Sequence, residues 1–91
     1  MAFEVLLTAD AASDLEEIDR IESAIAALAR FPARGAYPAE LLALGIREYR
    51  ETFFKPYRIL YRIQDKRVYV YLIADGRRDM QALLARRLLG A

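Results

Sequence analysis

The spacing of apolar and polar residues predicts that the chain begins with a strand followed by a helix. Residues 3–7 are typical of a strand, and Thr8 is a residue type that caps the N-termini of helices. Residues 9–18 then have helical spacing. Three apolar side chains are expected on the buried stripe of this helix: Ala12, Leu15 and Ile18. Three acidic side chains are expected in water: Asp14, Glu16 and Glu17.

A second helix is expected from residue 19 to about Arg30. Asp19, with Glu22 three places later, resembles a capping box, which marks the start of a helix. The alternative is one long helix that runs across Asp19. In either case, the inward-facing residues after Asp19 are expected to be Ile21, Ile25 and Leu28. Proline and glycine break the regular pattern over residues 31–45, so we interpret that segment as a connection with one short helical turn.

The second half of the chain predicts three strands. They are expected at 46–54, 57–63 and 67–73, separated by Pro56 and by a tight polar turn at 64–66. Side chains alternate across a strand, so each strand should present two different faces. For the middle strand, one face would carry Arg58, Leu60 and Arg62, and the other Tyr57, Ile59, Tyr61 and Ile63.

A final helix is expected after Asp79, which suits an N-cap position. Its apolar residues recur at helical spacing: Met80, Leu83, Leu84 and Leu88. This stripe is either core or a partly uncovered surface for a partner. The order of elements predicts a single α+β domain over residues 1–91, with an N-terminal strand and helical hairpin, an antiparallel three-stranded meander and a C-terminal helix.

Composition excludes several classes of protein. The 91-residue chain is 56% hydrophobic, which argues against disorder and allows one modest core. It has no cysteine, which removes thiol chemistry, and no histidine, which removes the usual general base near neutral pH. The sequence shows no metal-ligand spacing, secretory signal or membrane-length apolar run. We therefore expect a cytoplasmic protein with no metal and no other cofactor.

Charge is distributed unevenly along the chain. Residues 1–45 carry three basic and eight acidic groups, a net −5, whereas residues 46–91 carry eleven basic and five acidic groups, a net +6. The two halves either neutralise each other within the fold or create a functional polarity. The small overall charge of +1 argues against strong sequence-independent binding of nucleic acid.

Arginines near the predicted strand ends are the main candidates for a functional site. A guanidinium within an apolar strand is costly unless it has a partner or a function. Arg58 and Arg78 would suit an anion clamp that holds a phosphate. Arg77 and Lys55 either extend that patch or are solvated surface charges. The structural alternative for the two arginines is ion pairing with Glu48, Glu51 or Asp79.

Tyrosines are frequent on the predicted strands. The chain has six tyrosines, and four of them lie on strands: Tyr57, Tyr61, Tyr69 and Tyr71. Packing with the hydroxyl at the rim of the core is the simpler explanation. An exposed aromatic surface that stacks on bases is the alternative.

The chain resembles the RelE/ParE family of bacterial toxins over nearly its whole length. Two motifs carry the resemblance: the Pro-Tyr-Arg-Ile-Leu-Tyr-Arg-Ile strand at 56–63, and the Asp-Gly-Arg-Arg-Asp turn at 75–79 that leads into the final helix. Toxins of this family are paired with antitoxins in type II toxin–antitoxin systems. RelE-like members cut mRNA on the ribosome, whereas ParE-like members inhibit DNA gyrase.

The resemblance implies roles for the arginines, but the chain departs from the RNA-cutting branch. In that branch, arginines at the positions of Arg58 and Arg78 support phosphate chemistry, together with basic residues on the preceding strand and often a tyrosine in the last helix. Leu84 occupies the position of that tyrosine here. The preceding strand instead offers Tyr49, Glu51 and Phe53. Without histidine, a nuclease would lack an obvious group for proton transfer.

The resemblance, with these departures, therefore favours a ParE-like toxin that is bound by a cognate antitoxin and inhibits DNA gyrase by direct contact, without being an enzyme. The expected target-binding residues are Arg58, Arg77 and Arg78. The expected antitoxin-binding residues are Met80, Leu83, Leu84 and Leu88. One alternative is a ribosome-dependent mRNA endoribonuclease, and another is a degenerate member that only binds its antitoxin. For the nuclease, the candidate catalytic residues are Arg58, Arg78, Lys55 and Tyr57.

Overall fold

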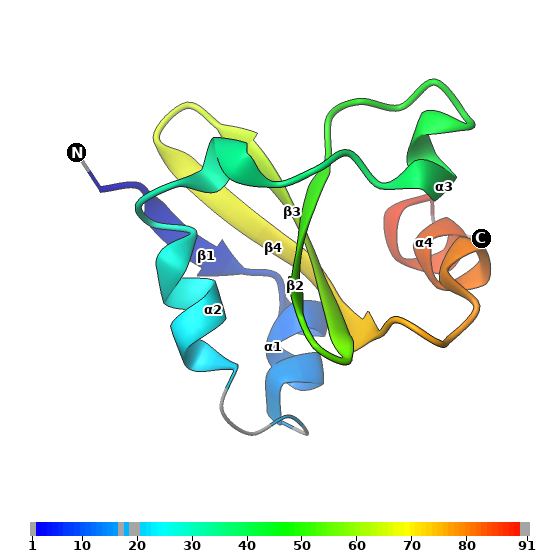
Figure 1. Cartoon of the computed structure of the whole chain (residues 1–91), viewed down its shortest axis with the longest axis horizontal. Coiled ribbons are helices and arrows are strands. Elements are labelled where there is room, and N and C mark those ends of the chain that lie inside the picture. The colour runs from blue at the N-terminus through cyan, green and yellow to red at the C-terminus, as the bar shows by residue number, and fades with distance from the viewer. Residues whose placement is uncertain (1, 17, 19–20, 90–91) are drawn as a thin grey trace.

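The computed structural model describes residues 2–16, 18 and 21–89, which form a four-stranded sheet flanked by helices (Figure 1). In chain order the elements are β1 (Glu4–Leu7), α1 (Ala9–Glu16), α2 (Glu22–Ala27), the 3₁₀ helix η1 (Pro32–Arg34), α3 (Ala39–Leu42), β2 (Arg50–Phe54), β3 (Tyr57–Gln64), β4 (Arg67–Asp75) and α4 (Met80–Leu89). The described residues include no helix with the length and apolar character needed to cross a membrane.

The strands are ordered β1-β4-β3-β2 in the sheet. β2, β3 and β4 pair antiparallel in succession, and β1 pairs parallel with β4. Asp65 has a φ of 58°, the left-handed conformation that suits the tight turn between β3 and β4. The predicted α+β class, with its N-terminal strand, antiparallel meander and C-terminal helix, is confirmed.

One face of the sheet packs against α1 and α2 and holds the larger apolar core. Alternation along β3 places Ile59 and Tyr61 on this face, both with 0% exposure, as the strand pattern predicts. The residues of the sheet buried here, which define the α1–α2 face, are Ile59, Tyr61, Val68, Val70 and Ile73. The helical segments contribute Ala11, Ile18, Ile21, Ile25 and Leu28.

The first helix is capped as expected, but it buries Ala11 in place of the predicted Ala12. Thr8 Oγ1 accepts a hydrogen bond from the Ala11 N–H at 3.1 Å. Ala11 is fully buried, whereas Ala12 is exposed, so the prediction for Ala12 was wrong. The buried stripe therefore passes through Ala11, Leu15 and Ile18, and Asp14 lies at its edge, half-buried rather than in water. Helical spacing alone allows either choice, because both alanines suit a core.

The segment at 9–30 forms two helices. Ile18 and Ile21 lie between α1 and α2 and are not helical, which excludes one continuous helix. The predicted capping box at Asp19 lies outside the described residues. The helical hairpin of the prediction is thus confirmed.

The opposite face of the sheet is covered in part by α3 and α4. Its buried residues, which define the α3–α4 face, are Leu41, Leu60, Leu72, Ala74, Met80 and Leu84. A β-bulge shapes this face, because Leu60 pairs with Leu72 while Tyr61 pairs with Val70. Tyr71 is left as the extra residue on β4.

The second strand is shorter than the sequence predicts. Residues 46–54 were expected to be extended, but β2 includes only the last five of them. Ile46 and Tyr49 pack against the core of the α3–α4 face, while the two residues between them are exposed. This spacing of three places fits a bend around the core and not the alternation of a strand.

Side chains from α1 and α4 cover the edge of β4 beyond the end of β1. The pairing of β1 with β4 stops at Val70. Beyond it, Asp14 accepts a hydrogen bond from the Ile73 N–H at 3.0 Å, and Arg87 donates to the Tyr71 carbonyl at 2.8 Å. Arg87 also donates to Asp14 at 2.9 Å. These bonds replace the missing strand partner and fasten α4 to both α1 and β4.

Candidate functional site

Arg58 lies on the α3–α4 side of β3, where two carboxylates hold it. Its Nε donates to Glu51 Oε1 on the neighbouring strand β2 at 2.7 Å. Its Nη1 and Nη2 donate to the two carboxylate oxygens of Glu40, on α3, at 2.9 and 2.8 Å. The side chains of Arg58 and Glu51 are 13% and 7% exposed. We call Glu40, Arg58 and Glu51 the ion-pair triad.

The ion-pair triad occupies the part of Arg58 that would bind an anion. A phosphate binds an arginine through paired N–H groups, and Glu40 already takes such a pair. The hydrogen bonds lower the pKa of Glu40 and raise the pKa of Arg58, so both groups are charged at neutral pH. With two carboxylates for one guanidinium, the triad is net negative and would repel a phosphate.

Arg78 does not join Arg58 in this structure. Arg78 is exposed and lines a hollow with Asp14, Ile18 and Tyr57, residues that lie on the α1 side of the sheet. The carboxylate partners of Arg58 come instead from α3 and β2. Among the described residues, the two guanidiniums therefore share neither a partner nor a pocket, and no two-arginine clamp is assembled.

Three exposed cations gather where the β2–β3 turn meets the β4–α4 turn. The Gly76 N–H donates to the Pro56 carbonyl at 2.8 Å and so joins the two turns. Asp75 binds Arg77 at 2.7 Å, and hydrogen bonds from Arg77 lower the pKa of Asp75 to about 2. The exposed cations, which we call the basic end, are Lys55, Arg77 and Arg78.

The tyrosine and lysine considered for proton transfer lie outside the ion-pair triad. Tyr57 is half-buried against the core of the α1–α2 face, and Lys55 is exposed at the turn. Tyr49 packs against the other core, and burial, reinforced by Tyr71, raises its pKa. A tyrosine with a raised pKa is a poor general base at neutral pH.

Sequence reasoning found one of the two carboxylates that hold Arg58. Glu51 is one of the three predicted partners. Glu48 is exposed, and Asp79 instead caps α4 by accepting a hydrogen bond from the Ala82 N–H at 3.1 Å. Glu40 was missed because it lies 18 residues from Arg58, on a short helix inside the segment interpreted as a connection.

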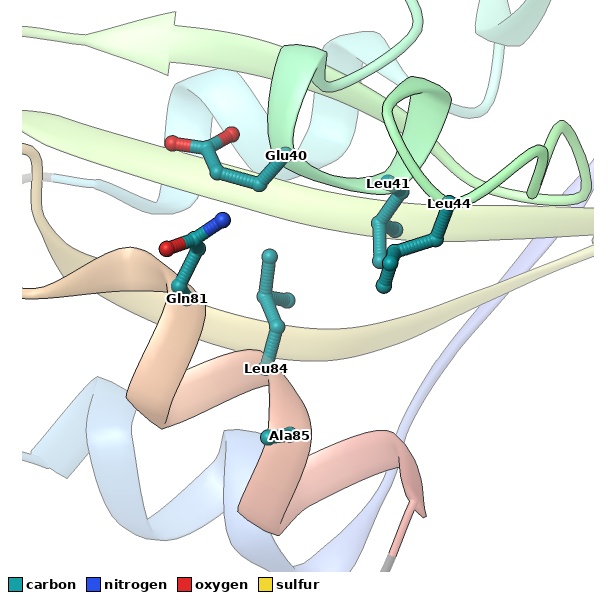
Figure 2. A pocket seen from close by; sticks show the side chains of 6 residues that line it. All are labelled: Glu40, Leu41, Leu44, Gln81, Leu84 and Ala85. Atoms are coloured by element: carbon teal, nitrogen blue, oxygen red, sulfur yellow. The ribbon is translucent and has the colours of Figure 1, made fainter.

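The apolar stripe of α4 is largely used inside the protein. Met80 and Leu84 are 4% and 2% exposed, whereas Leu83 and Leu88 are half-buried. Figure 2 shows the small pocket between α3 and α4, where Leu44 and Leu84 point toward one another. Its lining residues are Glu40, Leu41, Leu44, Gln81, Leu84 and Ala85. A partner at this stripe would reach the half-buried leucines and the rim of the pocket first.

No metal centre is evident in the described part of the chain, where no three or more potential ligands from histidine, cysteine, aspartate and glutamate lie close enough to hold an ion. The arrangement therefore offers an internally neutralised arginine, an exposed basic end and a partly covered apolar stripe.

Comparisons with known proteins point to one family. No curated protein matches the sequence. The solved RelBE2 toxin–antitoxin complex from Mycobacterium tuberculosis contains a similar chain, with 27% identity and a TM-score of 0.66, over 82% of this chain and 99% of that chain. The sequence profile described as the ParE toxin of the type II toxin–antitoxin system parDE matches residues 5–80, which include both motifs. This chain therefore belongs to the ParE toxin family of type II toxin–antitoxin systems.

Proposed function

We propose that this toxin acts by binding a protein target, DNA gyrase, and that a cognate antitoxin neutralises it by direct contact inside the cell. Membership of the ParE family supports the choice of target. The similar RelBE2 chain comes from a toxin–antitoxin complex, which supports an antitoxin partner for this chain.

The observation that carries the non-enzymatic mechanism is the ion-pair triad. Cleavage of RNA through its 2′-hydroxyl requires a base, an acid and cations that stabilise the phosphate. Arg58 is bound by Glu40 and Glu51 and is not free to serve as such a cation. The chain has no histidine. Arg78, the second expected cation, lies on the other side of the sheet end.

The basic end is our candidate for the surface that binds the target. Arg77 and Arg78 are exposed there beside Lys55, and exposed charges at an interface accelerate association and select partners. Arg58 would act indirectly, because a Cβ at Gly76 would lie 3.3 Å from its Cδ. Its stem therefore supports the turn that presents Arg77 and Arg78.

The antitoxin is expected to bind over α4 and the neighbouring sheet. Antitoxin segments of this kind fold on binding, as a helix in a groove or as an added strand. Leu83 and Leu88 are half-buried, and Leu44 at the pocket rim is 64% exposed. Met80 and Leu84 would contribute only if α4 shifted, because both are buried.

The direct test is inhibition of gyrase-catalysed DNA supercoiling by the purified toxin. We expect inhibition by the wild type and about a tenfold loss of potency for the double variant Arg77→Ala/Arg78→Ala. The matched control is Arg30→Ala/Arg86→Ala, which removes two exposed charges from outside the basic end. It should inhibit like the wild type.

A translation reaction with a defined mRNA provides the opposing test. Cleavage of the mRNA by the wild type, lost in both Arg58→Ala and Arg78→Ala, would replace the proposal with ribosome-dependent RNA cutting. A toxin that neither inhibits gyrase nor cuts mRNA, but still binds its antitoxin, would be a degenerate member of the family.

A further inference from the structure

Arg62 differs from the other half-buried arginines whose contacts define the fold. Arg58 pairs with Glu40 and Glu51, and Arg87 pairs with two acidic residues of α1. Arg50 is also half-buried, and it donates hydrogen bonds to the backbone carbonyls of Ala33 and Gly35. Arg62 is half-buried on the same side of β3 as Arg58, but no carboxylate of the described residues forms an ion pair with it. A partly desolvated guanidinium without an anion retains unused binding capacity.

Tyrosines from β4 and from the segment before β2 lie near this unpaired cation. Tyr69 on β4 is the register partner of Arg62. Tyr71, the extra residue of the bulge, meets Tyr49 edge to face with ring centroids 5.4 Å apart. Arg62 is close enough to Tyr49 to oppose the effect of burial on its pKa. We call Tyr49, Arg62, Tyr69 and Tyr71 the tyrosine–arginine patch.

We infer that the tyrosine–arginine patch binds an aspartate or glutamate side chain of the antitoxin, with an apolar neighbour of that residue against the tyrosine rings. This inference rests on the proposed function. A carboxylate supplies two acceptors for the guanidinium fork, and tyrosine offers both an apolar ring and a hydroxyl. The chemistry selects an acidic segment that also carries apolar or aromatic residues.

Position favours the antitoxin over the target for this patch. The basic end proposed for the target lies where β3 begins and β4 ends, at Tyr57 and Asp75. Arg62 and Tyr69 lie toward the opposite end of the same two strands, near the turn at 65–66. Substitutions at the two sites can therefore be tested separately.

The limited exposure of the patch favours a single side chain over a nucleic-acid strand. Tyr49, Tyr69 and Tyr71 are only half-exposed, which limits the stacking of bases. The small net charge of +1 also argues against strong binding of a polyanion.

The test measures the affinity of the full-length toxin for the antitoxin encoded beside its gene, by titration calorimetry. We expect Arg62→Gln to weaken binding about tenfold or more, and Arg62→Lys to weaken it less, because lysine keeps the charge but not the fork. Arg30→Gln, the same change at an exposed arginine away from the patch, should leave affinity unchanged. Circular dichroism and thermal melting of each variant verify folding.

A second set of variants, in the antitoxin, makes the test independent of how Arg62 variants fold. Each aspartate and glutamate of the antitoxin is changed in turn to asparagine or glutamine. One such antitoxin variant should bind the wild-type toxin as weakly as the wild-type antitoxin binds Arg62→Gln. Binding of that antitoxin variant to Arg62→Gln should be little weaker still. If no single change does so, the inference is wrong.

The remaining outcomes separate this inference from the proposed function. If the wild type binds the antitoxin and Arg62→Gln binds it with the same affinity, the inference is wrong but the proposed function stands. Absence of any binding by the wild type would overturn the antitoxin partnership itself. Loss of binding to a fluorescein-labelled single-stranded RNA in Arg62→Gln, with antitoxin binding intact, would assign the patch to nucleic acid and overturn the inference.

Discussion

The two faces of the sheet are stabilised by different kinds of contact. The α1–α2 face is closed by apolar side chains, with Ile59 and Tyr61 at its centre. The α3–α4 face has a smaller apolar core, and beside it Arg58 is held by Glu40 and Glu51. Apolar packing depends little on pH, whereas an ion-pair triad depends on the protonation of its carboxylates. The difference indicates that the α1–α2 face stabilises the fold at any pH, whereas the stability of the α3–α4 face changes with the protonation of its carboxylates.

Arg58 and Arg62 make the same contrast within a single strand. They lie four residues apart on β3, and their side chains point to the same side of the sheet. Arg58 obtains its partners from inside the molecule. Arg62 has no such partner among the described residues, and we propose that the antitoxin supplies one.

The largest expected effect comes from the α1–α2 face. Ile59→Ala should lower the free energy of unfolding by about 3–4 kcal/mol, because the site is fully buried in a packed core. The loss should be the same at pH 7 and pH 4, since no charge is involved. Urea denaturation followed by circular dichroism at both pH values measures it, with Ile59→Val as the control at about 1 kcal/mol. A loss below that of the valine variant would show that this face is loosely packed.

An effect of about 3 kcal/mol is expected at the ion-pair triad. Arg58→Ala leaves the buried Glu51 without its partner, which is strongly destabilising. The combined replacement Arg58→Met/Glu40→Leu/Glu51→Leu should recover most of that loss, because well-packed apolar residues substitute for buried ion pairs. Urea denaturation at pH 7 compares the two. If the combined variant is as unstable as Arg58→Ala, the triad is needed for more than charge balance.

The triad should also make stability depend on pH in the acidic range. Arg58 lowers the pKa of Glu40 in the folded state below its ordinary value of 4.5. The stabilisation by Glu40 is then fully present above pH 4.5 and is lost as the pH falls through the lower, folded-state pKa. Glu40→Gln should flatten that part of the curve of unfolding free energy against pH. An unchanged acid slope would mean that the contact does not persist in solution.

The smallest effect is expected where α4 is fastened to the sheet. Arg87→Ala should cost about 1–2 kcal/mol, because it removes the bonds to Asp14 and to the Tyr71 carbonyl. Amide hydrogen exchange should accelerate in α4 more than in β3. Arg86→Ala is the matched control, because Arg86 is the neighbouring residue and its side chain is exposed. This variant should change neither the free energy of unfolding nor the exchange rates. Equal acceleration in α4 and β3 would contradict a local fastening.

Much of the architecture follows from local patterns in the sequence. The alternation along 57–63 predicts both faces of β3, and the tight polar turn predicts the β3–β4 hairpin. Thr8 and Asp79 cap helices as their residue types suggest. Where patterns were ambiguous, the prediction was wrong, as at Ala12 and at the start of β2. The sequence cannot tell which of two adjacent alanines is buried, or whether an extended segment is a straight strand or bends around a core. Local spacing does not show which distant residues pack against the segment.

By itself, then, the sequence determined the order of elements, the two faces of the central strand and the residue types at the candidate site. Tertiary structure alone decided the partners of those residues. Glu40 and Arg58 are 18 positions apart, and Asp14 and Arg87 are 73 apart. The physical reason is that hydrophobic periodicity is a local property, whereas an ion pair depends on which distant side chains the packed elements bring within a few ångströms.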